Sequence, residues 1–216
     1  MWLLPFPRAT YIRIMKRRFF LGALSAFSIA APALAQSQPL SLNELSNYLN
    51  TLTSAQGAFT QVNPDGTLSK GTFYLKRPGR MRFEYEPPND ALVVAGQGKL
   101  AIFDKRSNSG GQQYPLHRTP LHIILKDKVN LNASGMVVAH QHDGTATTVT
   151  AQDPQHPNYG NVKLVFTANP TELRQWIVTD ESGQKTTVVL GKLEHNKRLQ
   201  ARLFNVDRIA KEGDIR

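Results

Sequence analysis

The sequence predicts an α+β fold, in which two amphipathic helices pack against one strongly curved antiparallel sheet as a plug or lid. The main observation is a series of short stretches with strand character, at 58–63, 71–77, 80–86, 91–95, 99–104, 135–142, 145–151, 161–167, 172–179 and 185–193. Short strands at this spacing indicate an antiparallel meander, which would form either a sandwich or a curved open barrel.

Many of these strands are separated by residues that reverse the chain within a few positions. The turn sequences are Pro64-Asp65-Gly66, Pro78-Gly79, Asp143-Gly144, Asn169-Pro170 and Glu181-Ser182-Gly183. Gly96-Gln97-Gly98 also lies between two strands, so we interpret it as a hairpin and not as a phosphate-binding loop, which would precede a helix.

Two helices are expected. Ser41 and Glu44 have the spacing of a capping box, and leucines at 42, 45, 49 and 52 follow at helical spacing, which predicts a helix of about a dozen residues. The second begins after Thr119 as N-cap, with Pro120 at its first position. Its apolar stripe is expected to consist of Leu121, Ile124 and Leu125.

Residues 1–35 have the pattern of a signal peptide, with a cationic start, an apolar run and small residues at 33–35. We expect cleavage there, which would leave 36–216 as a single domain in the bacterial periplasm. Met15 is an alternative start. The pair Arg17-Arg18 resembles a twin-arginine motif, so both the Sec and the twin-arginine export routes remain open. Gln36 would follow the cleavage site and, unlike a cysteine, could not be lipidated.

Composition excludes several kinds of site. The chain has no cysteine, which rules out disulfides, thiolate metal sites and a cysteine nucleophile. Its 26 Lys and Arg exceed its 16 Asp and Glu, but five of the basic residues lie before position 36, so the expected mature chain has a net charge of only +5. That charge and the expected export argue against a nucleic-acid partner.

Sites for metals and for catalysis are not expected. His140, His142 and Asp143 have a spacing that could hold zinc, but no third strong ligand is placed by spacing, so we interpret them as polar residues of a solvated strand that ends in a turn. The sequence has no G-x-S-x-G motif. We therefore expect no catalytic residues, no metal and no cofactor.

The stretch LKRPGRMRFEYEPP at 75–88 contains three arginines, and the alternation of side chains along a strand does not place all three on the same face of the sheet. Arg80 and Arg82 alternate with Met81, Phe83 and Tyr85, so they are expected on an outer, solvated face beside Glu84 and Glu86. Arg77 continues the face of Phe73 and Leu75. Its guanidinium either enters the apolar space with its donors satisfied or reaches water at the strand end.

The runs GAFTQ at 57–61 and GTFYLKRPGRMRFEY at 71–85, followed by Pro87-Pro88, resemble the LolA family of periplasmic outer-membrane lipoprotein carriers. The resemblance extends from about 40 to 206, although the family's C-terminal Phe-x-Phe and Pro-x-Gly are not matched at 203–207. It implies an open antiparallel half β-barrel, with helices covering its concave apolar face as a lid. It also implies that Arg77 is the latch that holds the lid closed.

The resemblance further implies a monomeric periplasmic chaperone and not an enzyme. Such a carrier accepts acylated lipoproteins from an inner-membrane ABC release complex and delivers them to an outer-membrane receptor or the outer membrane itself. The receptor shares the fold but is lipidated at a cysteine, so Gln36 favours the carrier. The alternative is a periplasmic lipid- or small-hydrophobe-binding protein, or an enzyme, on the same scaffold. The expected cavity and lid residues are Arg77, Phe59, Phe73, Leu75, Met81, Phe83, Tyr85, Leu121, Ile124 and Leu125.

Overall fold

The computed structural model describes residues 38–104 and 111–212, so the expected signal peptide at 1–35 lies outside the described residues. The strands are β1 Ser54–Val62, β2 Leu68–Lys76, β3 Arg80–Tyr85, β4 Ala91–Gly96, β5 Lys99–Asp104, β6 Gln112–Pro115, β7 Val137–His142, β8 Ala146–Gln152, β9 Asn161–Thr167, β10 Glu172–Thr179, β11 Lys185–Leu190 and β12 Glu194–His195. Each predicted strand is present, whereas β6 and β12 were not predicted.

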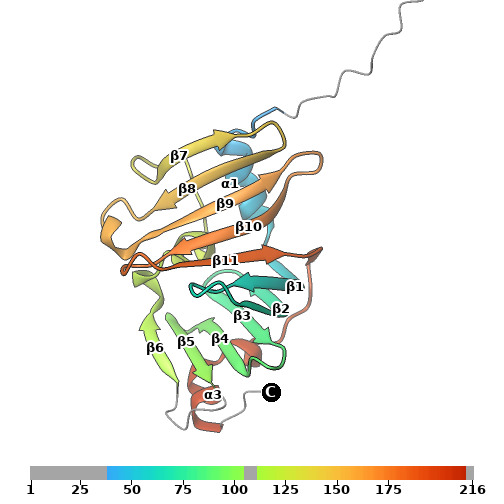
Figure 1. Ribbon diagram of the computed structural model, residues 1–216, viewed down its shortest axis with the longest axis vertical. Coiled ribbons are helices and arrows are strands. Elements are labelled where there is room, and N and C mark those ends of the chain that lie inside the picture. The colour runs from blue at the N-terminus through green and yellow to red at the C-terminus, as the bar shows by residue number, and fades with distance from the viewer. Residues whose placement is uncertain (1–37, 105–110, 213–216) are drawn as a thin grey trace, which may run out of the picture. The chain divides into compact units, whose positions relative to one another are not determined.

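The strands form one open antiparallel sheet (Figure 1). Its order is β6-β5-β4-β3-β2-β1-β11-β10-β9-β8-β7, and β12 pairs with β1 beyond the end of β11. Each predicted turn joins two strands that are neighbours in this order. Most strands pair with the strands next to them in sequence. Strand β1 is different, because it pairs with β2 on one side and with the distant β11 on the other, and so joins the two halves of the sheet.

The first helix is α1, Leu42–Thr51, and Figure 1 shows it crossing behind the strands β8 to β10. The predicted capping box is confirmed. The Ser41 hydroxyl accepts from the backbone N–H of Glu44, and the Glu44 carboxylate accepts from the backbone N–H of Ser41. Leu45 and Leu49 are buried, as the apolar periodicity predicts.

The second helix is shorter than predicted. It consists of α2, His122–Leu125, preceded by the 3₁₀ turn η1, Leu116–Arg118. The prediction of Thr119 as N-cap is wrong, because its hydroxyl donates to the carbonyl oxygen of Leu116 at 2.8 Å and makes no capping bond to α2. The chain is therefore mostly β with a few short helices. Within 38–104 and 111–212, no helix combines the length and hydropathy needed to cross a membrane.

A segment that was not predicted to be helical follows β12. It contains the 3₁₀ turn η3, Ala201–Phe204, and the helix α3, Val206–Glu212. The helix packs against β4 and β5, and Figure 1 shows it beside them. The cluster formed there contains Leu92, Val94, Ala101, Phe103, Val206 and Ile209.

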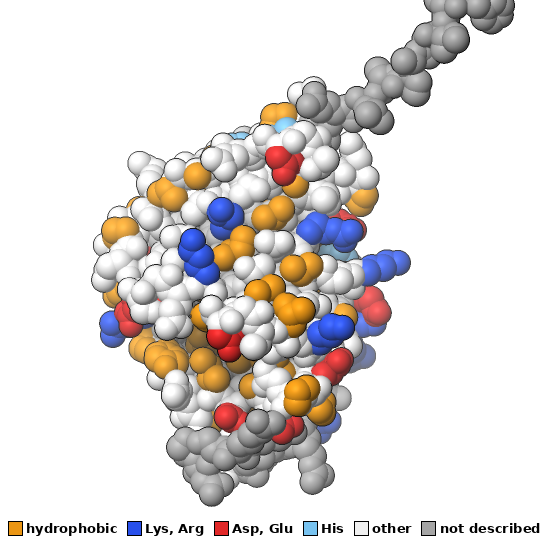
Figure 2. All heavy atoms as spheres, in the orientation of Figure 1, with side chains coloured by type: hydrophobic (Ala, Val, Ile, Leu, Met, Phe, Trp, Pro, Cys, Tyr) orange, Lys and Arg blue, Asp and Glu red, His pale blue; other side chains and the backbone are white. Residues whose placement is uncertain are grey.

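The sheet therefore has apolar residues on both faces. Because side chains alternate along a strand, Leu92 and Val94 of β4 face α3, whereas Ala95 belongs to the larger cluster that includes α1 and α2. On the face of the sheet seen in Figure 2, charged side chains of both signs are scattered among polar ones. Apolar side chains gather there over β5 and β6, where Ile102 and Tyr114 are 39% and 45% exposed.

Candidate functional site: an apolar cavity beneath α1 and α2

The apolar face of β2 and β3 follows the predicted parity. Phe73 pairs with Phe83 across the two strands, and Leu75 pairs with Met81. Phe59 of β1 joins them, with its ring in edge contact with that of Phe83 at 5.0 Å between centroids. These five side chains are at most 5% exposed.

These side chains belong to the large buried apolar cluster, and the helices α1 and α2 contribute its other side. Leu45 and Leu49 come from α1, and Ile124 and Leu125 come from α2. The cluster thus contains seven of the residues predicted from the sequence, which are Phe59, Phe73, Leu75, Met81, Phe83, Ile124 and Leu125. Leu121 and Tyr85 are partly buried and pack against it.

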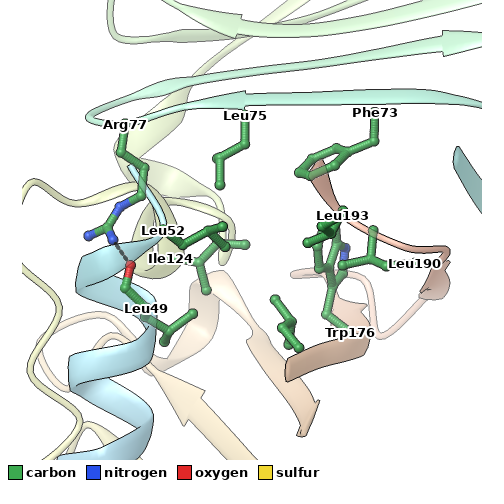
Figure 3. A pocket seen from close by; sticks show the side chains of 10 residues that line it. Leu49, Leu52, Phe73, Leu75, Arg77, Ile124, Trp176, Leu190 and Leu193 are labelled. Carbon is green, nitrogen blue, oxygen red and sulfur yellow. Dashed lines mark hydrogen bonds between the residues drawn. The ribbon is translucent and has the colours of Figure 1, made fainter. Parts of the chain in front are cut away.

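A small cavity remains between the sheet and the two helices (Figure 3). Its free volume of about 10 Å³ is roughly the room for one water molecule. Figure 3 shows Phe73, Leu75 and Arg77 projecting from one wall. The full lining is Leu49, Leu52, Phe73, Leu75, Arg77, Ile124, Leu173, Trp176, Leu190 and Leu193.

Leu173 and Trp176 of β10 are cavity residues that parity counting did not find. Their spacing would place them on opposite faces of a regular strand. The pairing of β10 with β9 shifts between Leu173 and Gln175, so both side chains are buried on the apolar side. The indole of Trp176 lies 5.4 Å from the ring of Phe73, centroid to centroid. An isolated tryptophan in a predicted strand was the one signal available for this position.

Arg77 lies at the edge of the cavity and bonds to α1 and to the chain that follows α2. Its guanidinium donates to the carbonyl oxygen of Leu49 on α1, and this bond is drawn in Figure 3. The Nε atom donates to the carbonyl oxygen of Lys126 at 3.1 Å, and Nη2 also donates to that of Asp127 at 3.3 Å. Of the two orientations that the sequence left open, the structure has the one in which backbone acceptors satisfy the donors.

The surroundings of Arg77 disfavour an unpaired charge. Burial lowers the pKa of Arg77 from its usual value, and the nearby Asp127 carboxylate opposes that shift. The guanidinium nonetheless stays charged at physiological pH, because arginine pKa values begin so high. Loss of its carbonyl partners would therefore leave a half-buried cation.

A second polar group lies at the β1 side of the cluster. The phenol of Tyr85 donates to Oε1 of Gln61 at 2.7 Å, and its ring contacts that of Phe59. Burial raises the pKa of Tyr85 to about 12, so the phenol is neutral over the physiological range. The position can therefore present an uncharged hydrogen-bonding group next to apolar side chains.

The prediction that Arg82 lies on a solvated face is wrong. Arg82 does have the outer parity, and its Nε donates to Glu84 at 2.6 Å. However, the chain around η3 covers this face, and Arg82 is only 2% exposed. Its Nη1 donates to the carbonyl oxygen of Leu203 at 3.1 Å. Arg80 is partly exposed, and its Nε donates to the carbonyl oxygen of Pro78 at 3.4 Å.

The histidines that could have held zinc have protein partners. Nε2 of His140 lies 3.0 Å from the carbonyl oxygen of Leu40, and Nδ1 of His142 lies 3.2 Å from the hydroxyl of Thr147. Asp143 accepts from the backbone N–H groups of the following turn, which lowers its pKa to about 2. Nowhere in 38–104 or 111–212 do three metal-ligating side chains form a group that could hold an ion.

Comparison of the sequence with known proteins finds relatives that belong to one family. The model of the outer membrane lipoprotein carrier protein LolA family matches residues 50–207. An outer-membrane lipoprotein carrier protein of Chromohalobacter salexigens is 26% identical over 206 residues, which cover 91% of this chain and 94% of the relative. The carrier of Cupriavidus necator is 35% identical over 95 residues, which cover 40% of this chain and 43% of the relative.

A solved LolA superfamily protein of Nitrosomonas europaea is 12% identical, with a TM-score of 0.40, and the match covers 78% of this chain and 99% of that one. The family match spans well over half of the sequence and includes the strands and the helix α2 that surround the cavity, whereas most of α1 precedes it. The chain therefore belongs to the outer membrane lipoprotein carrier protein LolA family.

Proposed function

We propose that this protein is a periplasmic carrier that binds the acyl chains of lipoproteins released from the inner membrane and delivers them to the outer membrane. Family membership supports this function, because the curated relatives are named as outer-membrane lipoprotein carriers. The apolar cluster between the sheet and the helices α1 and α2 would provide the binding space, in a half-barrel whose concave face the helices close as a lid.

Energetics explain why such a cargo needs a carrier with a lid. Each buried methylene contributes about 0.8 kcal/mol, so a multiply acylated lipoprotein does not leave a membrane unaided. A carrier must cover those chains and still release them. In this protein the leucines and isoleucines of α1 and α2 fill the space that acyl chains would occupy. Cargo and lid would compete for the same face, which keeps the net affinity moderate.

The observation that carries the proposal is the bonding of Arg77. From the cavity edge, its guanidinium donates to α1 through Leu49 and to the chain after α2 through Lys126. We infer that Arg77 is the latch of the closed state. The lining would consist of Phe59, Phe73, Leu75, Met81, Phe83 and Tyr85 from the sheet and of Leu121, Ile124 and Leu125 from the lid.

The proposal includes a route through the cell. Residues 1–35 would direct export and be removed, which leaves 36–216 in the periplasm. The carrier would take lipoproteins from an inner-membrane ABC release complex and pass them to an outer-membrane receptor or to the membrane itself. It would act as a monomer and without a cofactor.

Native mass spectrometry of protein purified from the periplasm tests the cargo and the cleavage site together. The chain is expected to begin at Gln36, and a fraction of the molecules should be bound to a triacylated or diacylated lipoprotein. A reconstituted assay then measures transfer, with lipoprotein released from inner-membrane vesicles into the soluble fraction by the added carrier. Failure to release any lipoprotein would overturn the proposal.

Other co-purifying ligands would support the alternative. Free phospholipid or fatty acid without lipoprotein would indicate a general hydrophobe-binding protein on this scaffold. A ligand that is chemically altered on incubation would indicate an enzyme. These outcomes can be told apart by the mass of the bound species.

A further inference from the structure

The helix α1 and the irregular segment that follows α2 are joined by a row of polar contacts. Three side chains of α1, at 43, 46 and 50, have the spacing of one helix face. Each contacts the segment 126–132, and we call this row the α1 seam. Its contacts are Asn43 with Asn132, Ser46 with Leu131, and Asn50 with Val129.

Asn50 makes the most complete of these contacts. Its Oδ1 accepts from the backbone N–H of Val129 at 2.9 Å, and its Nδ2 donates to the carbonyl oxygen of the same residue at 2.9 Å. The side chain thus pairs with Val129 as a neighbouring β-strand would. Val129 is only 3% exposed, so its backbone groups need such partners.

Ser46 supports the same junction one helical turn away. Its hydroxyl accepts from the backbone N–H of Leu131 at 3.0 Å and donates to the carbonyl oxygen of Leu42 at 2.6 Å. Ser46 and Leu131 are both buried. The segment 126–132 has no helical or strand structure, so these side chains supply partners that regular secondary structure would otherwise provide.

Arg77 binds at the end of this seam. Its Nη2 lies 3.4 Å from Oδ1 of Asn50, the same oxygen that accepts from Val129. Its other acceptors are the carbonyl oxygens of Leu49, next to Asn50, and of Lys126 and Asp127. The guanidinium can reach all of them only while the seam keeps α1 and the segment together.

We propose that Asn50 is a positioning residue that makes α1 and the segment 126–132 one body, so that Arg77 holds or releases both together. This inference rests on the proposed function, since it explains how one arginine could control a lid of two parts. Without the seam, Arg77 could keep one part closed while the other opened, and the apolar face would be only half uncovered.

Hydrogen exchange of backbone amides in the ligand-free, mature-length protein tests the proposal. In the parent protein, Arg77→Leu is expected to accelerate exchange in α1 and in 127–132 by the same factor, because both open in one event. In the Asn50→Ala background, the factor by which Arg77→Leu accelerates exchange in α1 should differ from the factor for 127–132 by at least about threefold. Exchange in 127–132 should already be roughly tenfold faster there, as expected when two hydrogen bonds of ordinary net strength are lost.

Two further variants keep the result interpretable. Ser46→Ala removes the partner of Leu131 while favouring helix formation, so it should uncouple the two parts even if Asn50→Ala folds poorly. Thr51→Ala is the matched control, because its hydroxyl bonds within α1 to the carbonyl oxygen of Tyr48. It should leave the two factors equal.

Unequal factors in the parent would overturn the one-body proposal, as would equal factors in both the Asn50→Ala and the Ser46→Ala backgrounds. These measurements use no ligand. A failure to carry lipoproteins would therefore overturn the proposed function and leave the exchange result standing.

Discussion

Arg77 and Arg82 donate to backbone carbonyls on opposite sides of the same sheet. Arg77 bonds to Leu49 and Lys126 beside the cavity, and Arg82 bonds to Leu203 on the face covered by the C-terminal segment. Each arginine therefore fastens a separate covering element to β2 and β3. Substitution of one should loosen its own element and leave the other in place.

Arg77→Leu should raise the affinity for an apolar fluorophore about tenfold or more. Hydrogen bonds from a charged donor each contribute about 1.5–3 kcal/mol, and their loss would increase the fraction of open protein. Titration by fluorescence measures this change. Arg80→Leu is the control, because within the described residues the Arg80 side chain bonds only to the carbonyl oxygen of Pro78 in its own turn, at 3.4 Å. Equal affinities of the two variants would contradict a latch at Arg77.

Arg82→Ala should lower the free energy of unfolding by about 2–3 kcal/mol. The change removes the donor to the Leu203 carbonyl and the ion pair of the Glu84 carboxylate, which would keep its bond from the Tyr74 hydroxyl. Denaturation in urea measures the loss, and limited proteolysis should show faster cleavage near Leu203. Arg80→Ala should stay within about 0.5 kcal/mol of the parent. A similarly small change for Arg82→Ala would show that its burial does not stabilise the fold.

Gly96→Ala should displace the chain around η3. A methyl group at this position would lie 1.9 Å from the carbonyl oxygen of Phe204, closer than any real contact. Separation of the two segments would weaken the packing of Val206 and Ile209, at a cost of about 1–3 kcal/mol. Thermal unfolding measures the change. An unchanged midpoint would mean that the C-terminal segment adapts without loss.

Acid should destabilise the protein in part through His122. Burial, followed by the charges of Lys126 and His117, lowers the pKa of His122 below its usual value of 6.5. The unfolded chain then binds more protons than the folded one just below pH 6.5, so stability falls as the pH decreases through this range. Urea midpoints at pH 7.5 and pH 5.5 should differ less in His122→Asn than in the parent. His195→Asn, at an exposed site on β12, should not reduce the difference.

Trp176 should report directly on acyl chains in the cavity. The sequence has two tryptophans, Trp2 and Trp176, and cleavage after residue 35 would leave Trp176 alone. A brominated fatty acid should quench its emission, whereas the same acid without bromine should not. Iodide should quench little, because Trp176 is 2% exposed. Lack of quenching at a concentration where binding is saturated would place the ligand elsewhere.

Local chemistry was sufficient to predict most of the sheet and one of its faces. Turn residues such as Asp143-Gly144 separate the strands, and alternation along 71–85 assigns Phe73, Leu75, Met81 and Phe83 to one side. Both signals act over a few residues. The capping box of α1 is equally local, and it was also predicted correctly.

What local patterns could not predict depends on distant parts of the chain. Arg82 is buried because residues near Leu203 cover it, and nothing around position 82 encodes that cover. The shift in β10 that turns Trp176 inward arises from its pairing with β9. The seam at Asn50 likewise needs Val129, which lies in a segment without periodicity.

The position of β1 in the sheet also sets the order in which the protein can fold. Its main partners are β2, which follows it directly, and β11, which is among the last strands to be made; the short strand β12 also pairs with it, at Ala55 and Gln56. The first half of the sheet can therefore form early, but the wall of the cavity is completed only when nearly the whole chain is available. Such long-range pairing makes folding slow. If the chain is translocated across a membrane in an unfolded state, it would thus not complete its fold until translocation is almost finished.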